Sequence, residues 1–85
     1  MLALREPTSL AIDSAHQLLF VGDTAYQKVW VMHCTGFYVV REITSTVSAI
    51  NQFMGITGLC FAPDNNELYV LDRCALLLLV RGIWL

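Results

Sequence analysis

The side chains best suited to chemistry are few, and their spacing does not favour it. The three cysteines, Cys34, Cys60 and Cys74, are odd in number and include no C-x-x-C pair. The pattern therefore indicates neither a disulfide framework nor a zinc site. We expect the cysteines to serve as small buried hydrophobic residues. A reduced, intracellular setting fits this usage.

The two histidines and the serines form no catalytic pattern either. His16 falls in a predicted polar loop and His33 ends a predicted strand, and we expect each to be a surface or hydrogen-bonded histidine rather than a metal ligand. No G-x-S-x-G sequence surrounds any serine. The sequence predicts no catalytic residue, no cofactor and no metal site. It leaves the question of enzymatic activity open, and favours a chain that is not an enzyme.

Aromatic residues cluster in the middle of the first half of the chain. They could form a stacking surface for a ligand, or they could pack structural units together; we expect the packing role. The residues concerned are Tyr26, Trp30, Phe37 and Tyr38.

Composition points to surface that the chain does not cover by itself. Of its 85 residues, 56% are hydrophobic and 14% are charged, against about 45–50% and about 25% in typical domains. A partner subunit, further repeats or a membrane could cover the excess. The longest apolar run, Ala75–Val80, is too short for a spanning helix, which needs about 20 residues. Arg5, Glu6 and Pro7 interrupt any signal-peptide core. The five basic residues are scattered at a net charge of −2, so no nucleic-acid footprint is seen.

Short apolar segments between turn residues predict a chain of β-strands. The segment Lys28–His33 is apolar on both faces, so we expect it to be covered on both sides. Gly36, in the next turn, is suited to a positive φ angle. Residues 44–55 are expected to be a connection containing one helical turn. The other predicted strands are Ser9–Asp13, Leu18–Val21, Phe37–Ile43, the two arms of a hairpin spanning Thr57–Asp72, and Ala75–Val80.

A repeat becomes visible when the chain is shifted by 49 positions, which places Leu10 on Leu59. Five of the seventeen pairs from position 7 to position 23 are then identical, at Thr8, Leu10, Leu19, Val21 and Asp23. These matches fall at equivalent strand and turn positions, so we expect two superposable antiparallel hairpins. A period of about 40–50 residues with four strands per unit is typical of a propeller blade.

Three segments of the first unit fit a known repeat pattern: Pro7–Asp13, Leu19–Asp23 and Lys28–Val31. Together they resemble an NHL repeat. The second unit, with Gly58–Asp64 and Leu68–Asp72, is similar both to NHL repeats and to six-bladed, TolB-like propellers of the gluconolactonase and YVTN kinds. The first hairpin lacks the expected glycine, and the tail Ala75–Leu85 departs from the pattern after Asp72. The resemblance also suggests that Asp23 and Asp72 either point into a central channel or accept backbone N–H bonds in the turn after each strand; we expect the second.

The resemblance implies an all-β fold, a partial propeller of about one and a half to two four-stranded antiparallel blades. Residues 1–85 form one partial domain: a first blade at 7–43, a connection at 44–56, and an incomplete or divergent blade at 57–85. The expected function is a non-catalytic interaction module that binds a protein partner or further blades and self-associates. A remnant of a gluconolactonase-like enzyme and a truncated product without independent function are the alternatives.

Overall fold

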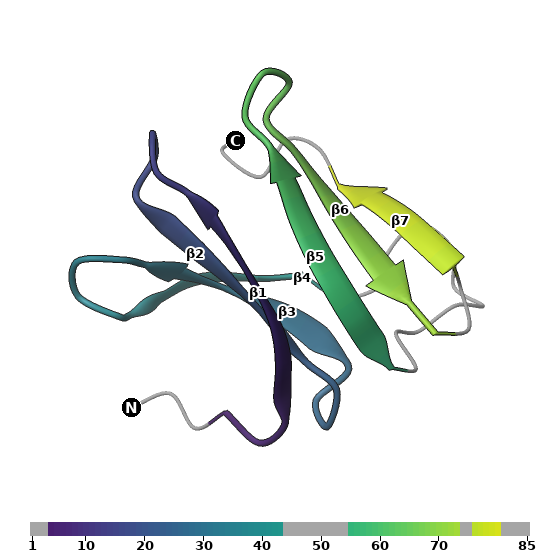
Figure 1. The fold of residues 1–85 in the computed structure, drawn as a ribbon. Helices are drawn as coiled ribbons and strands as arrows, with labels where there is room; N and C mark the ends of the chain where they lie inside the picture. The colour runs from purple at the N-terminus through teal and green to yellow at the C-terminus, as the bar shows by residue number, and fades with distance from the viewer. Residues whose placement is uncertain (1–3, 44–54, 74–75, 81–85) are drawn as a thin grey trace.

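The structure is a computed structural model that describes residues 4–43, 55–73 and 76–80. These residues are all-β and form two antiparallel sheets (Figure 1). Sheet A has the strand order β1-β2-β3-β4 and sheet B the order β5-β6-β7. The strands are β1 (Pro7–Asp13), β2 (Leu18–Asp23), β3 (Lys28–His33), β4 (Val39–Ile43), β5 (Ile56–Ala62), β6 (Glu67–Asp72) and β7 (Leu76–Val80). Across the described ranges, no helix has the length and apolar character needed to cross a membrane.

The first hairpin of each sheet has the same construction, as the repeat predicts. Asp13 pairs with Leu18 in sheet A, and Ala62 pairs with Glu67 at the positions 49 residues later. Both first strands also carry an irregularity at the equivalent place, between residues 7 and 9 and between residues 56 and 58. The two predicted hairpins are thus confirmed, although β5 begins at Ile56, one residue earlier than expected.

The third strands keep the pairing but not the spacing. Phe20 pairs with Val31 in sheet A, and Tyr69 pairs with Leu79 in sheet B, so the offset falls from 49 to 48. The reason is that four residues separate β2 from β3 and three separate β6 from β7. The strand predicted at Ala75–Val80 is confirmed over Leu76–Val80 as β7, and Ala75 lies outside the described residues. The helical turn predicted within residues 44–55 falls almost wholly outside the described residues, as does the tail 81–85.

The turns share one backbone feature that the sequence did not reveal. The residue that rejoins the strand has a left-handed φ angle, 57° at Gln17 and 53° at Asn66. In the connection after β3 the left-handed residue is Phe37, at 53° and two residues before β4, so the expectation for Gly36 was wrong. Phe37 N donates to His33 O at 2.8 Å. The chain therefore reverses within residues 34–36, and the strained conformation falls on the residue that follows them.

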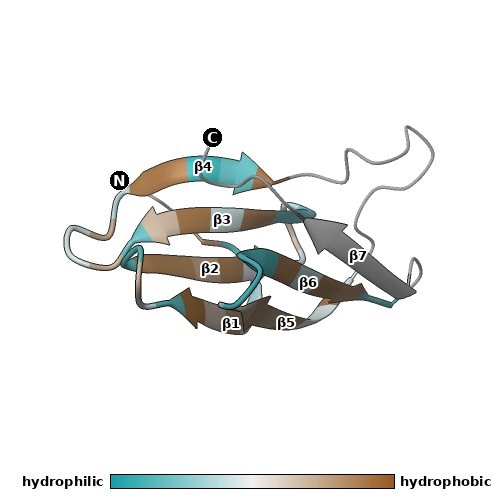
Figure 2. Ribbon diagram, turned by 90° about the horizontal axis from the view of Figure 1, so that it is seen from above, coloured by the Kyte–Doolittle hydropathy of each residue, from teal (hydrophilic) through white to brown (hydrophobic). Residues whose placement is uncertain are grey.

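Two apolar clusters hold the fold, one on each side of sheet A. The first fills the space between the sheets and includes Phe20, Val29 and Val31 from sheet A with Leu68 and Val70 from sheet B. The second lies on the other side of sheet A and consists of Val21, Trp30 and Met32, with Leu19 and Val39 against them. Strand β3 is accordingly buried on both faces, as predicted. Hydrophobic residues run along the central strands of both sheets, and β1 lies beside β5 (Figures 1 and 2).

Candidate functional site

Each sheet has two apolar faces, which the repeat allows us to match. The front face consists of the repeated apolar positions of the first two strands. In sheet A it comprises Leu10, Ile12, Leu19 and Val21, and in sheet B Leu59, Phe61, Leu68 and Val70. The back face lies on the opposite side and includes Ala11 and Phe20 in sheet A, and Cys60 and Tyr69 in sheet B.

Inside the chain, the front face of sheet B packs on the back face of sheet A. The rings of Phe20 and Phe61 stack with centroids 5.5 Å apart, and Leu68 and Val70 have no exposed surface. The first strands are also joined by a hydrogen bond from Thr8 Oγ1 to Ile56 O at 2.7 Å. A Cβ atom at Gly22 would lie 2.8 Å from the Cγ2 atom of Ile56, so a glycine is needed for this close approach.

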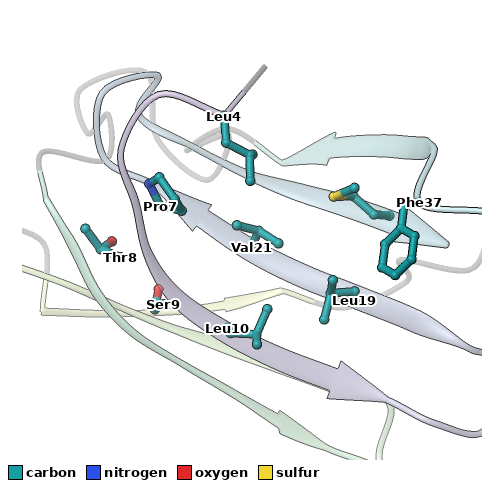
Figure 3. A pocket seen from close by; sticks show the side chains of 9 residues that line it. Leu4, Pro7, Thr8, Ser9, Leu10, Leu19, Val21 and Phe37 are labelled. Carbon is teal, nitrogen blue, oxygen red and sulfur yellow. The ribbon is translucent and has the colours of Figure 1, made fainter. Parts of the chain in front are cut away.

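Within the described residues, no sheet packs on the front face of sheet A, and only its β2 side is covered, where Val21 is buried beside Trp30 and Met32. Leu10 is 58% exposed and Ile12 is 56% exposed, whereas their equivalents in sheet B, Leu59 and Phe61, are partly buried. A shallow, largely apolar hollow lies over this face and extends to Leu4 (Figure 3). The alternation of polar and apolar residues in Ser9–Asp13 already indicates that Leu10 and Ile12 share one face of a strand. That this face is open follows only from the arrangement of the sheets.

The back face of sheet B is the second surface that the described residues leave partly open, since Leu71 and Cys60 are exposed whereas Glu67 is buried. A smaller hollow there is lined by Gly58, Leu59, Cys60, Tyr69 and Leu71. Leu71 is 48% exposed, and Tyr69 Oη donates to Glu67 Oε1 at 3.1 Å. Cys60 is exposed, so the prediction of a buried cysteine is wrong there, because no sheet within the described residues packs over this side chain. Cys34 is partly exposed, and Cys74 lies outside the described residues.

Asp23 is a buried carboxylate that joins the chain before β1 to the chain after β2. It accepts hydrogen bonds from the backbone N–H groups of Arg5 and Glu6, both at 3.0 Å, from Tyr26 N at 3.3 Å, and from Trp30 Nε1 at 3.3 Å. Burial raises the pKa of Asp23, but these four bonds together lower it below the usual 3.8. The charged carboxylate therefore stabilises the backbone before β1 and after β2. This agrees with the predicted role of Asp23 as an acceptor of backbone N–H bonds.

Asp72 repeats this arrangement in sheet B. Gly55 N donates to Asp72 Oδ1 at 2.9 Å, and Gly55 is the position equivalent to Glu6. The backbone bond from Arg73 N to Gly55 O likewise repeats the bond from Thr24 N to Glu6 O. The predicted backbone partners are therefore confirmed for both carboxylates. Their location needs correction: except for Tyr26 N, these backbone donors precede the first strand of each sheet rather than following the second.

One pair of titratable groups was missed by sequence reasoning. His16 Nδ1 lies 2.7 Å from Asp13 Oδ2, and His16 N lies 3.3 Å from Asp13 Oδ1. The spacing of three residues across a turn could have indicated this pair. His33 accepts a hydrogen bond from Thr35 N and stacks on Tyr38. Within the described part of the chain, no three His, Cys, Asp or Glu residues are grouped as metal ligands.

The four aromatic residues singled out in the sequence do not form the contact between the sheets. Trp30 is buried in the cluster on the front side of sheet A, with Tyr26 edge-on at 5.7 Å between ring centroids. Lys28 Nζ lies 4.9 Å from the Trp30 ring centroid and 2.7 Å from Glu42 Oε1. Phe37 and Tyr38 are exposed. A role for these residues in packing against a further unit stays a prediction.

Comparisons of the chain with protein family models, with curated proteins and with solved structures found no match. The resemblance to NHL repeats therefore stays a prediction from the sequence. The geometry alone defines the candidate site, which consists of the front face of sheet A and the back face of sheet B.

Proposed function

We propose that this chain is a non-catalytic interaction module, built from two NHL-like propeller units, that packs against further units or a protein partner through its open faces. The observation that carries the proposal is the exposed front face of sheet A. Its counterpart in sheet B already buries Leu68 and Val70 completely by packing on a neighbouring sheet. A surface of the same residue types in the same register is thus suited to the same use.

The arrangement of strands supports a propeller-like reading of the two units. Sheet A is a four-stranded antiparallel meander, and its first strand lies next to the first strand of sheet B (Figures 1 and 2). Sequential units that pack through successive sheet faces leave one open face at each end until a ring closes. A complete propeller has typically four to eight blades, so two units leave both end faces to be covered by something else.

The energy available at the front face is appreciable. Complete burial of a Leu or Ile side chain contributes about 1.5–3 kcal/mol. Leu10 and Ile12 are each somewhat more than half exposed. Covering both would therefore add about 2–3 kcal/mol at the same area coefficient, which is less than the cost of association of about 4–15 kcal/mol, so a partner must also make contacts beyond these two side chains.

An apolar dye and sedimentation test the proposal together. The chain should bind an apolar fluorescent dye, and the variant Leu10→Lys/Ile12→Lys should bind much less dye while keeping its β circular dichroism. Val40→Lys, at an exposed position on β4, is the matched control and should leave dye binding unchanged. A 9.5 kDa monomer that binds no dye and unfolds cooperatively would show that the chain closes its own core, and would contradict the proposal.

A further inference from the structure

The two open surfaces are equivalent, through the repeat, to the two faces that pack on each other inside the chain. The front face of sheet A is equivalent to the front face of sheet B, which packs on a back face. The back face of sheet B is equivalent to the back face of sheet A, which receives a front face. We propose that the front face of sheet A binds the back face of sheet B of a second copy of this chain, head to tail. This inference rests on the proposed function and names the partner for its open faces.

The internal interface specifies the contacts of the second one. Phe20 stacks on Phe61 within the chain. Shifting Phe20 forward by 49 positions gives Tyr69, and shifting Phe61 back gives Ile12, so Tyr69 of one copy should lie on Ile12 of the next. The bond from Thr8 Oγ1 to Ile56 O becomes a bond from Thr57 Oγ1 to Pro7 O. Thr57 Oγ1 donates to Leu71 O at 3.2 Å within the chain, so its hydroxyl would exchange this acceptor for Pro7 O, a carbonyl that proline keeps.

At one point of this interface the repeat is broken, and the larger of the two contacting side chains lies on the opposite face. Within the chain, the small residue Gly22 admits the large side chain of Ile56. At the proposed interface the corresponding residues are Leu71 and Pro7, so the large side chain is now on the back face. Leu71 is 48% exposed, and Pro7 borders the hollow on the front face (Figure 3). In the proposed interface Leu71 of the back face can therefore fill the space that Ile56 of the front face fills within the chain.

The proposed interface should be weaker than the internal one. Leu18, which belongs to the core between the sheets, corresponds to Glu67 on the back face of sheet B. Glu67 accepts a hydrogen bond from Tyr69, and this polar pair replaces apolar contacts. Reversible association is expected as a result. Because a front face meets a back face, the contact is heterologous, and repeated contacts give a closed ring or an open filament according to the rotation between copies.

Site-directed cross-linking distinguishes this arrangement from the alternatives. The tail chain keeps its exposed Cys60 and carries Cys34→Ser and Cys74→Ser. The head chain carries Cys34→Ser, Cys60→Ser, Cys74→Ser and Ile12→Cys. Equimolar chains, one of them isotope-labelled so that their masses differ, are treated with a short bismaleimide. A matched head chain has Ala15→Cys, in an exposed turn, in place of Ile12→Cys, and Leu10→Cys provides a second front-face position.

Head-to-tail association predicts that the mixed dimer joining position 12 to Cys60 dominates. Its yield should be several-fold above that of the Ala15→Cys control, and Leu10→Cys should behave like Ile12→Cys. Dominant links between two head chains or between two tail chains would show a symmetric contact and overturn the inference. A mixed yield no higher than the control would overturn it as well. If dye binding still depends on Leu10 and Ile12 in either case, the proposed function survives and only the choice of partner fails.

Discussion

Replacing Asp23 with alanine should remove a large part of the stability of sheet A. The carboxylate is fully buried and accepts four hydrogen bonds. Two come from the backbone just before β1, one from the backbone of the turn after β2, and one from the Trp30 ring. A buried donor left without a partner costs about 1–3 kcal/mol. That full cost applies to Trp30 Nε1, whose bond is buried. The three backbone donors are only partly buried, so water can replace part of their loss.

The expected loss is about 3 kcal/mol in the free energy of unfolding, if about 1–2 kcal/mol comes from Trp30 Nε1 and about 0.5 kcal/mol from each backbone donor. A chain of this length has a total stability of about 4–13 kcal/mol, so the change is large. Urea denaturation followed by circular dichroism, at one fixed chain concentration because association shifts apparent stability, gives the measurement. Asp64→Ala, in an exposed turn, is the control and should change stability by less than about 0.5 kcal/mol.

The reasoning would be refuted if Asp23→Ala and Asp64→Ala had equal effects. Such a result would mean that the segment before β1 is held by other contacts, and that the buried carboxylate contributes no net energy. Asp23→Asn provides an intermediate case, because the amide keeps one acceptor oxygen and loses the charge. The free energy of unfolding of Asp23→Asn should fall between those of wild type and Asp23→Ala.

Three further outcomes are expected. The pKa of Asp23 is lowered on folding, so its stabilising contribution is present above the unfolded pKa of about 3.9 and is lost as the pH falls through the folded pKa. Urea titrations from pH 6 to pH 3 should show this loss of stability, and the loss should be smaller in Asp23→Asn. Gln17→Gly should raise stability by about 1 kcal/mol, because a left-handed non-glycine residue costs about 1–2 kcal/mol and Gln17 has a φ of 57°; an unchanged urea midpoint would show that this turn is not strained. Isothermal titration should detect no stoichiometric binding of calcium or zinc, and one tight site per chain would revive the enzyme alternative.

The local sequence determined the hairpins and their repetition. Alternating apolar residues and turn clusters lie close together in the chain, so the strand ends can be predicted from the pattern itself. The apolar character of Lys28–His33 on both sides predicted correctly that β3 is covered twice. The equal spacing of 49 residues between Leu10 and Leu59 and between Asp23 and Asp72 reflects equivalent pairing positions in the two sheets. The sequence did not predict the length of the turn after β3, so the residue with a left-handed φ angle is Phe37 and not Gly36.

Only the tertiary structure decided which faces are covered. Leu10 and Leu59 are the same residue at the same position of a strand, yet one is exposed and the other packs in the core. Cys60 is exposed for the same reason, since nothing in the described part of the chain packs over its face. Two of the four donors to Asp23 come from residues 17 and 18 positions earlier. A residue type sets how favourable burial would be, but burial requires a second surface, and the placement of that surface depends on contacts between segments far apart in the chain.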